Sequence, residues 1–368
     1  MSRGVEDRAA PSCRGLTIPL VLVALCACRG KELPAEPPLV ASATTASAAI
    51  PAPVLPRDEA VFYPAMVTVA PGASADQVGK GLGRTEECSS CHEEVVRQQS
   101  LSAHAYASFN NPVYRRAVER LRVQSGDEAT FVCAGCHDPA LLLTGAMQSE
   151  VAPRDERAMA ALRCRMCHGI ETGHSDGNAS YRLGSQPLLV PQSGDAESVE
   201  RHRESVRPAD FESLCGPCHQ SFLHPLTGNA HHVSGQSELR AWRESAFQGQ
   251  GASRIDPGGE IQSCVDCHMP ATQARLEDVA ADAEGRIASH FSAGGHTWLG
   301  HMIGSDELLE QSRQMLEGAV TLRLVRIVDG EDLVVDVVLR NTGVGHRFPG
   351  GVRDATQTWI EVELLDAN

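Results

Sequence analysis

Five copies of one short pattern, CxxCH, carry the residues of this sequence whose types and spacing could do chemistry. With 13 Cys and 15 His in 368 residues, chance gives only ~0.02 copies, so the pattern is not accidental. It is the signature of c-type haem attachment, in which two thiols form thioethers to haem and the adjacent His becomes an axial iron ligand. The predicted thioether residues are Cys88, Cys91, Cys133, Cys136, Cys164, Cys167, Cys215, Cys218, Cys264 and Cys267, and the predicted proximal ligands are His92, His137, His168, His219 and His268.

Two other uses of paired cysteines explain the pattern less well. A zinc site needs four ligands in a tetrahedron, which gives no reason for a His directly after every second Cys. A disulfide within CxxC closes a very small loop and constrains the chain little. Only 4% of the residues are aromatic, so five haems c would also supply apolar surface that the side chains lack.

The segment that must position these motifs is residues 81–305, which we expect to be a pentahaem cytochrome c domain. It contains many Gly residues and short helical patterns, such as Glu93 to Ala107 and Pro112 to Val123, and strands are scarce. We therefore predict a mainly α, irregular multihaem fold wrapped around five haems, because the polypeptide serves chiefly to surround the cofactors.

Residues 306–368 have a different pattern and predict a partial β-sandwich-like domain. A helical stretch from Asp306 to Glu317 precedes VTLRLVRIV and LVVDVVLRN, which flank a Gly-containing turn and indicate a hairpin. TWIEVELL predicts a third strand. A sandwich needs about seven strands, so we expect this domain to be truncated. A small sheet packed on the first domain is the alternative.

The N-terminal residues 1–28 predict a secretory signal peptide. Three Arg residues precede an apolar run of 12 residues from Leu16 to Ala27, which is too short to span a bilayer. The run ends in a lipobox-like sequence before Cys28, which predicts lipidation of that thiol and a membrane attachment. Ordinary signal cleavage is the alternative. Residues 29–80 read as a Pro/Ala/Ser-rich linker, and we expect an exported bacterial protein that is periplasmic or anchored to the outer membrane.

The charge balance argues against nucleic acid as a partner. There are 32 basic and 47 acidic residues, a net charge of −15, and no Lys/Arg cluster that could follow a phosphate backbone. We expect the partners to be other redox proteins.

The ordered motifs resemble the cytochrome c554-like multihaem c-type cytochromes. The resemblance rests on CSSCHEEVVRQQSLSAHA, CAGCHDP, GNASYRL, SGQSELRAWRESAF before CVDCHMP, and GHRFPGG, and it covers roughly residues 81–365. It implies closely spaced haems between which electrons hop, mostly with two His ligands each. It also implies which histidines are distal ligands: His104, His202, His290 and His346, with His231, His232 and His296 competing for the fifth place.

We therefore expect an electron-transfer cytochrome rather than an enzyme. A different class, a multihaem reductase or oxidase of a small nitrogen or sulfur compound, would need one haem with an open distal position. A third possibility is an interaction subunit whose β-domain docks a partner enzyme. High-spin ferric iron would distinguish the reductase from the electron carrier.

Overall fold

The computed structural model describes residues 65–148, 150–184, 190–192, 194–206, 210–223, 233–249, 260–329, 332–352 and 358–363. The chain divides into two units, one of residues 1–50 and 358–368 and the other of residues 51–357. All the helices and strands given below lie in the second unit. The predicted boundaries at 80/81 and 305/306 fall inside this unit, and the predicted signal peptide, Cys28 and most of the linker lie outside the described residues.

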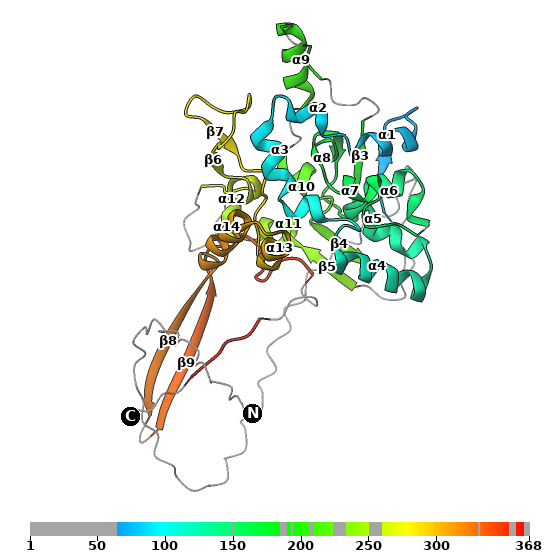
Figure 1. Cartoon of the computed structure of the whole chain (residues 1–368). Helices are drawn as coiled ribbons and strands as arrows, with labels where there is room; N and C mark the ends of the chain where they lie inside the picture. The colour runs from blue at the N-terminus through cyan, green and yellow to red at the C-terminus, as the bar shows by residue number, and fades with distance from the viewer. Residues whose placement is uncertain are drawn as a thin grey trace, which may run out of the picture. The chain divides into compact units, whose positions relative to one another are not determined.

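Short helices dominate the described part of the chain (Figure 1). The α-helices are α1 (Ala75–Gly81), α2 (Glu86–Ser89), α3 (Glu93–Ser100), α4 (Pro112–Ser125), α5 (Phe131–His137), α6 (Pro139–Leu143), α7 (Glu156–Ala160), α8 (Cys164–His168), α9 (Ala196–Ser205), α10 (Phe211–Cys215), α11 (Glu238–Arg243), α12 (Cys264–His268), α13 (Thr297–Ile303) and α14 (Asp306–Glu317). The 3₁₀ turns are η1 (Ala103–Tyr106), η2 (Glu128–Thr130), η3 (Ala146–Gln148) and η5 (Ala246–Gln248).

Capping residues explain where the longest helix begins and ends. In α4 the Asn111 side chain accepts hydrogen bonds from the N–H groups of Val113 and Tyr114, and Pro112 occupies the first turn, where its missing N–H costs nothing. Gly126 follows the helix with φ of 86°, a conformation that favours glycine. The helix predicted from Pro112 to Val123 is therefore present and two residues longer.

The strands form four small sheets. They are β1 (Thr68–Val69), β2 (Ile170–Gly173), β3 (Tyr181–Leu183), β4 (Gln220–Leu223), β5 (Val233–Ser237), β6 (Ala271–Gln273), β7 (Arg286–Ala288), β8 (Val320–Asp329) and β9 (Asp332–Asn341). The first sheet has the order β1-β3-β2, and the other three are the pairs β4-β5, β6-β7 and β8-β9. The predicted hairpin is present as β8-β9, with Val320 opposite Asn341.

The third strand predicted in the C-terminal part is wrong over its described residues. Residues 358–363 are exposed and have no strand conformation. Alternating apolar and acidic residues suit a strand with one buried face, but a strand also needs a neighbour whose backbone groups it can pair with. The described residues of this part therefore form a two-stranded hairpin and not a sandwich.

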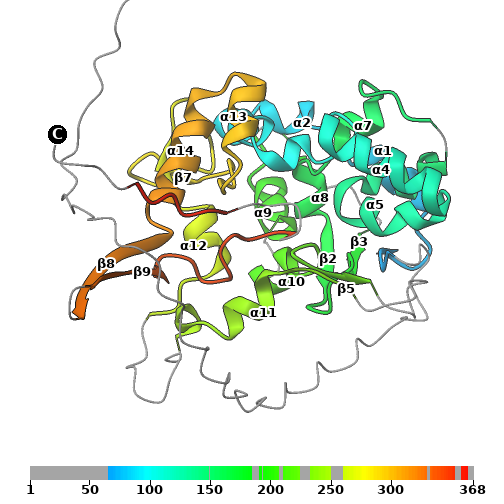
Figure 2. The same cartoon turned by 90° about the horizontal axis from the view of Figure 1, so that it is seen from below.

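Two apolar clusters hold the helices together. The larger surrounds α6, whose five residues are all buried, and includes Phe109, Met147 and Tyr181. The Tyr181 hydroxyl donates to the Gly135 carbonyl at 2.6 Å. The smaller cluster joins Phe291 to α13 and α14, which lie side by side (Figure 2). The helix α14, which was predicted at the start of the C-terminal part, thus packs against the motif-bearing part of the chain.

Candidate functional site

Each CxxCH motif lies on a helical turn, which brings its two thiols and its imidazole together. α5, α8 and α12 end on the motif His, and α12 contains its whole motif behind a capping box between Ser263 and Asp266. In the first motif, whose Cys88 lies in α2, the N–H of His92 donates to the Cys88 carbonyl at 2.9 Å. His219 makes the same bond to Cys215 at 2.9 Å. The sequence pattern thus has one local geometry in all five places.

Hydrogen bonds fix the orientation of the motif imidazoles. Nδ1 of His137, His168 and His268 lies 2.8, 3.3 and 2.7 Å from the carbonyls of Ala107, Val206 and Ala293, respectively. A carbonyl can only accept, so Nδ1 carries the proton in each case. Nε2 then presents a lone pair, as a metal-ligating imidazole must.

Three motif histidines face a second histidine at one common spacing. The ring centres are 6.1 Å apart for His92 and His202, 6.2 Å for His219 and His104, and 6.2 Å for His268 and His346. A metal lies about 2 Å from each imidazole nitrogen and roughly 1 Å more from the ring centre, so two trans ligands have ring centres about 6 Å apart. The three pairs therefore fit a haem iron between them.

Burial keeps the facing imidazoles of His104 and His219 neutral. Burial first, and then the neighbouring charges of His268, His296 and His137, lower the pKa of His104 to about 4. Burial and then His104 lower the pKa of its partner His219 to about 3. Neutral imidazole is the form that binds iron, so both rings are ready to ligate at physiological pH.

His290 belongs to the surroundings of the third motif. Burial lowers the pKa of His168 most, and the charge of His290 lowers it next. Nδ1 of His290 lies 2.8 Å from the Ala288 carbonyl, which leaves Nε2 as the free acceptor there too. The predicted distal ligand thus lies near one of the two motifs, those of His137 and His168, that lack a partner among the three ring pairs above.

A loop after β9 holds His346 in place. Nδ1 of His346 lies 3.0 Å from the Arg347 carbonyl, and Asn341 donates to the His346 carbonyl at 2.7 Å. Further along, the Gly351 N–H donates to the Glu238 carboxylate at 2.6 Å. The loop is therefore fixed from both sides of His346, and its His reaches the fifth motif from outside the 81–305 segment.

The other predicted distal candidates are not paired in this way. His296 lies edge-on to Trp298, with ring centres 6.5 Å apart, and burial lowers its pKa. His231 and His232 lie outside the described residues. The second motif has a different ring contact: Tyr114 stacks on His137 with ring centres 4.5 Å apart.

Contacts between cysteines bring the motifs together in space. Hydrogen bonds join Cys88 to Cys164, Cys218 to Cys136 and Cys215 to Cys264. These bonds first, and burial second, raise the pKa of the Cys88, Cys218 and Cys215 thiols. All ten motif cysteines are free of disulfides. The first motif therefore adjoins the third, the second adjoins the fourth, and the fourth also adjoins the fifth.

Sequence reasoning missed the polar residues that surround the ligands. Asp278 lies 3.0 Å from Nδ1 of His92, and Asp138 accepts hydrogen bonds from Ser108 and Tyr114 beside His137. Burial raises the pKa of Asp138 to about 7. Asp138 directly follows a motif and could have been considered, but nothing local marks Asp278, which is 186 residues from His92.

The described residues contain neither a membrane-spanning helix nor a cluster of side chains that could hold a bare metal ion. No helix there is long and apolar enough to cross a membrane. No group of three or more His, Cys, Asp and Glu side chains there is arranged to hold a bare metal ion.

Comparison with known proteins supports a cytochrome. Residues 87–169 match the family model of cytochrome c554 and c-prime. No curated protein and no solved structure matches the chain. The matched segment contains the first three motifs, and members of this family bind haem c covalently. Over residues 87–169 the chain is therefore similar to cytochrome c554 and c-prime, and this similarity supports a c-type cytochrome with covalent haem c that is involved in electron transfer.

Proposed function

We propose that the protein is an exported pentahaem c-type cytochrome that transfers electrons between other redox proteins. Each complete CxxCH motif attaches one haem, and most of the haems have two His ligands. The observation that carries the proposal is the spacing of 6.1 to 6.2 Å between facing imidazoles in three separate pairs. Ordinary packing of histidines gives no reason for one spacing to recur.

The chain supplies ligands for the haems and brings the haems close together. We assign His92 with His202, His219 with His104, and His268 with His346 as axial pairs. Near the third motif we assign His168 with His290, which the resemblance names as a distal ligand and whose Nε2 is left as an acceptor. The Nδ1 contacts of His92, His168, His268 and His346 leave Nε2 as the acceptor in the same way.

Bound haem supplies a one-electron couple between ferric and ferrous iron. The residues of this chain do the rest: the motif helices hold the thioether cysteines, the facing imidazoles fill both axial positions, and the cysteine contacts place neighbouring motifs side by side. Iron held between two imidazoles would have no coordination site for a substrate, so the four assigned pairs favour electron transfer over catalysis. The second motif, where Tyr114 stacks on His137, has no assigned distal His. The alternative, a reductase or oxidase of a small nitrogen or sulfur compound, requires one haem without a distal ligand.

Export and membrane attachment complete the proposal. They rest on the signal-like residues 1–28 and on the lipobox-like sequence before Cys28. A lipid on Cys28 followed by a Pro-rich linker would keep the cytochrome near a membrane while leaving it free to meet redox partners.

Haem counting and ferric spectroscopy test the proposal. We expect denaturing mass spectrometry of protein matured in a host with c-type maturation to show five haem additions per chain, because all five motifs are complete. Fewer additions would refute the count. We expect ferric electron paramagnetic resonance (EPR) to be mainly low-spin. More than one high-spin equivalent would refute the four assigned pairs, and a single one that binds carbon monoxide when reduced would favour the reductase.

A further inference from the structure

The first motif differs from the others in what its proximal His binds. Nδ1 of His92 lies 3.0 Å from Oδ1 of Asp278, whereas His137, His168 and His268 bind backbone carbonyls. A carbonyl is neutral, and a carboxylate carries a full negative charge. The hydrogen bond at His92 is therefore of the charge-assisted kind, which is about twice as strong as a neutral one.

The carboxylate of Asp278 is buried and held at both oxygens. Its side chain has 0% exposure, and the His92 side chain has 26%. Oδ2 accepts the N–H of Val95 at 3.0 Å, and Oδ1 also accepts the N–H of Ala280 at 2.9 Å. The backbone adds a bridge between residues 92 and 278, and the N–H of Val279 donates to the Cys91 carbonyl at 3.1 Å. Asp278 thus has one orientation relative to the first motif.

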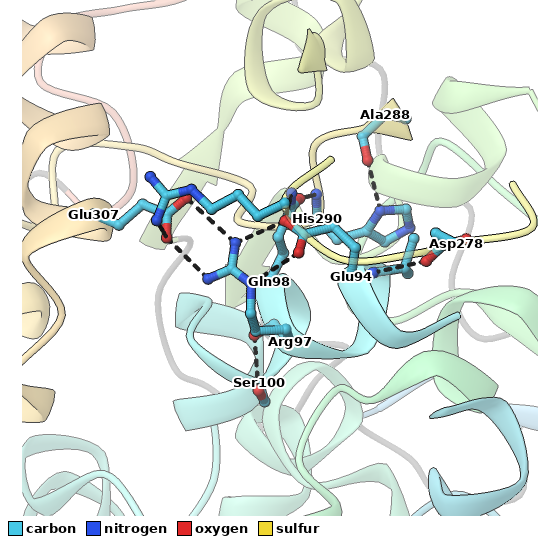
Figure 3. Close-up of polar contacts among 10 residues, drawn as sticks. Glu94, Arg97, Gln98, Ser100, Asp278, Ala288, His290 and Glu307 are labelled. Atoms are coloured by element: carbon cyan, nitrogen blue, oxygen red, sulfur yellow. Dashed lines mark hydrogen bonds and ion pairs between the residues drawn. The ribbon is translucent and has the colours of Figure 1, made fainter. Parts of the chain in front are cut away.

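The helix that follows the motif holds this arrangement together. In α3, Gln98 accepts the backbone N–H of His290 at 2.8 Å and donates to Glu94 at 2.8 Å (Figure 3). Arg97 donates to Glu94 at 2.7 Å and to Glu307 of α14 at 2.9 Å. One helix therefore fixes both the segment of Asp278 and that of His290.

We propose that Asp278 is a positioning residue that gives the haem of the first motif the lowest reduction potential in the protein. The inference rests on the proposed function, since it concerns a haem bound by His92. A carboxylate that accepts the Nδ1 proton makes the imidazole more basic and a stronger electron donor to iron. A stronger donor, with a negative charge behind it, stabilises ferric over ferrous iron and lowers the potential.

The consequence is a direction for electron flow. Electrons move downhill from low to high potential, so a strong reductant delivers them to the first motif. The adjoining third motif, whose Arg165 donates to Glu87 beside Cys88, receives them next.

The test replaces the charge without changing the shape. We expect Asp278→Asn to shift the ferric/ferrous equilibrium of one haem at least tenfold toward ferrous, which is about 59 mV for one electron. The EPR signal of one low-spin haem should move with it. Asp278→Glu should restore much of the low potential. The matched control is Asp282→Asn, which removes one charge nearby where Asp282 binds Arg286 at 3.0 Å. Asp282→Asn should shift no haem by as much.

The outcomes separate this inference from the proposed function. Equal shifts in Asp278→Asn and Asp282→Asn, with five haems retained in both, would overturn the role of Asp278 and leave the pentahaem proposal standing. If Asp278→Asn loses haem, the inference can be tested on the native protein instead. In a reductive EPR titration, one signal with the narrower g spread of imidazolate-like ligation should be the last to disappear. The absence of such a signal would overturn the inference, whereas fewer than five haems in the native protein would overturn the proposed function.

Discussion

Replacing His346 gives the most direct test of how the C-terminal part joins the cytochrome. His346 lies after β9, outside the segment that holds the five motifs, yet its ring centre is 6.2 Å from that of His268 and the two planes are within 9° of each other. In the proposed assignment it fills the distal position at the fifth motif. His346→Ala removes this imidazole and leaves its motif partner in place.

The expected effect is confined to one haem in five. The loop backbone keeps its contacts in the variant, because Asn341 binds the carbonyl of residue 346 at 2.7 Å and Glu238 binds the Gly351 N–H at 2.6 Å. We therefore expect one fifth of the ferric haem to become high-spin or water-bound. Its potential should rise by the equivalent of about a tenfold change or more, roughly 59 mV, because water donates less electron density to iron than imidazole.

Three measurements check this expectation. Ferric EPR counts the high-spin iron, carbon monoxide binding to the reduced protein counts open positions, and potentiometry follows the raised potential. His301→Ala is the control, because His301 is exposed on α13 and lacks a role in the assigned pairs. An unchanged low-spin count in His346→Ala would refute the ligand role. The ring would then serve the loop alone, through its contact with the Arg347 carbonyl.

Two further predictions concern the membrane and stability. Cys28→Ser should move the protein from the membrane to the soluble periplasmic fraction, while Cys26→Ser should leave it in place; retention of Cys28→Ser in the membrane would contradict lipidation there. Arg97→Met should lower the free energy of unfolding by about 3 kcal/mol in denaturant titrations, because it leaves the fully buried Glu94 carboxylate without its cation. The control Arg84→Met, which breaks an exposed 3.9 Å pair, should cost below about 1 kcal/mol, and equal effects would contradict the argument.

Local features of the fold could be predicted from the sequence because interactions between residues close in the chain, such as helix caps, determine them. The helix from Asp306 to Glu317 has the predicted bounds, with Ser305 capping its first turn. The strands β8 and β9 likewise pair as the two apolar stretches predict, with Val320 opposite Asn341. The helix expected from Glu93 to Ala107 is interrupted: α3 ends at Ser100, and Ser102 caps a separate 3₁₀ turn. A serine that caps a new turn is a signal the periodicity alone does not carry.

The pairing of the histidines could not be predicted in the same way. The resemblance singled out His104 and His202 as distal ligands, and the structure places them opposite His219 and His92. His202 precedes the fourth motif in sequence but faces the first, because α9 returns to it in space. Pairing of this kind depends on the path of the whole chain, so no spacing within a motif reveals it. The same holds for Asp278, which reaches His92 across most of the described chain.

The surroundings of the motifs differ in a way that bears on the proposed potentials. Cys133, Cys136 and Cys218, of the second and fourth motifs, pack against the larger apolar cluster. The first motif is instead held by the carboxylate of Asp278. Apolar burial disfavours the extra charge of ferric iron and raises a potential, whereas a nearby carboxylate favours that charge and lowers it. With haem bound as proposed, both effects order the potentials in one direction, from the first motif upward to the fourth. At the second motif the buried Asp138 carboxyl beside His137 opposes the effect of apolar burial.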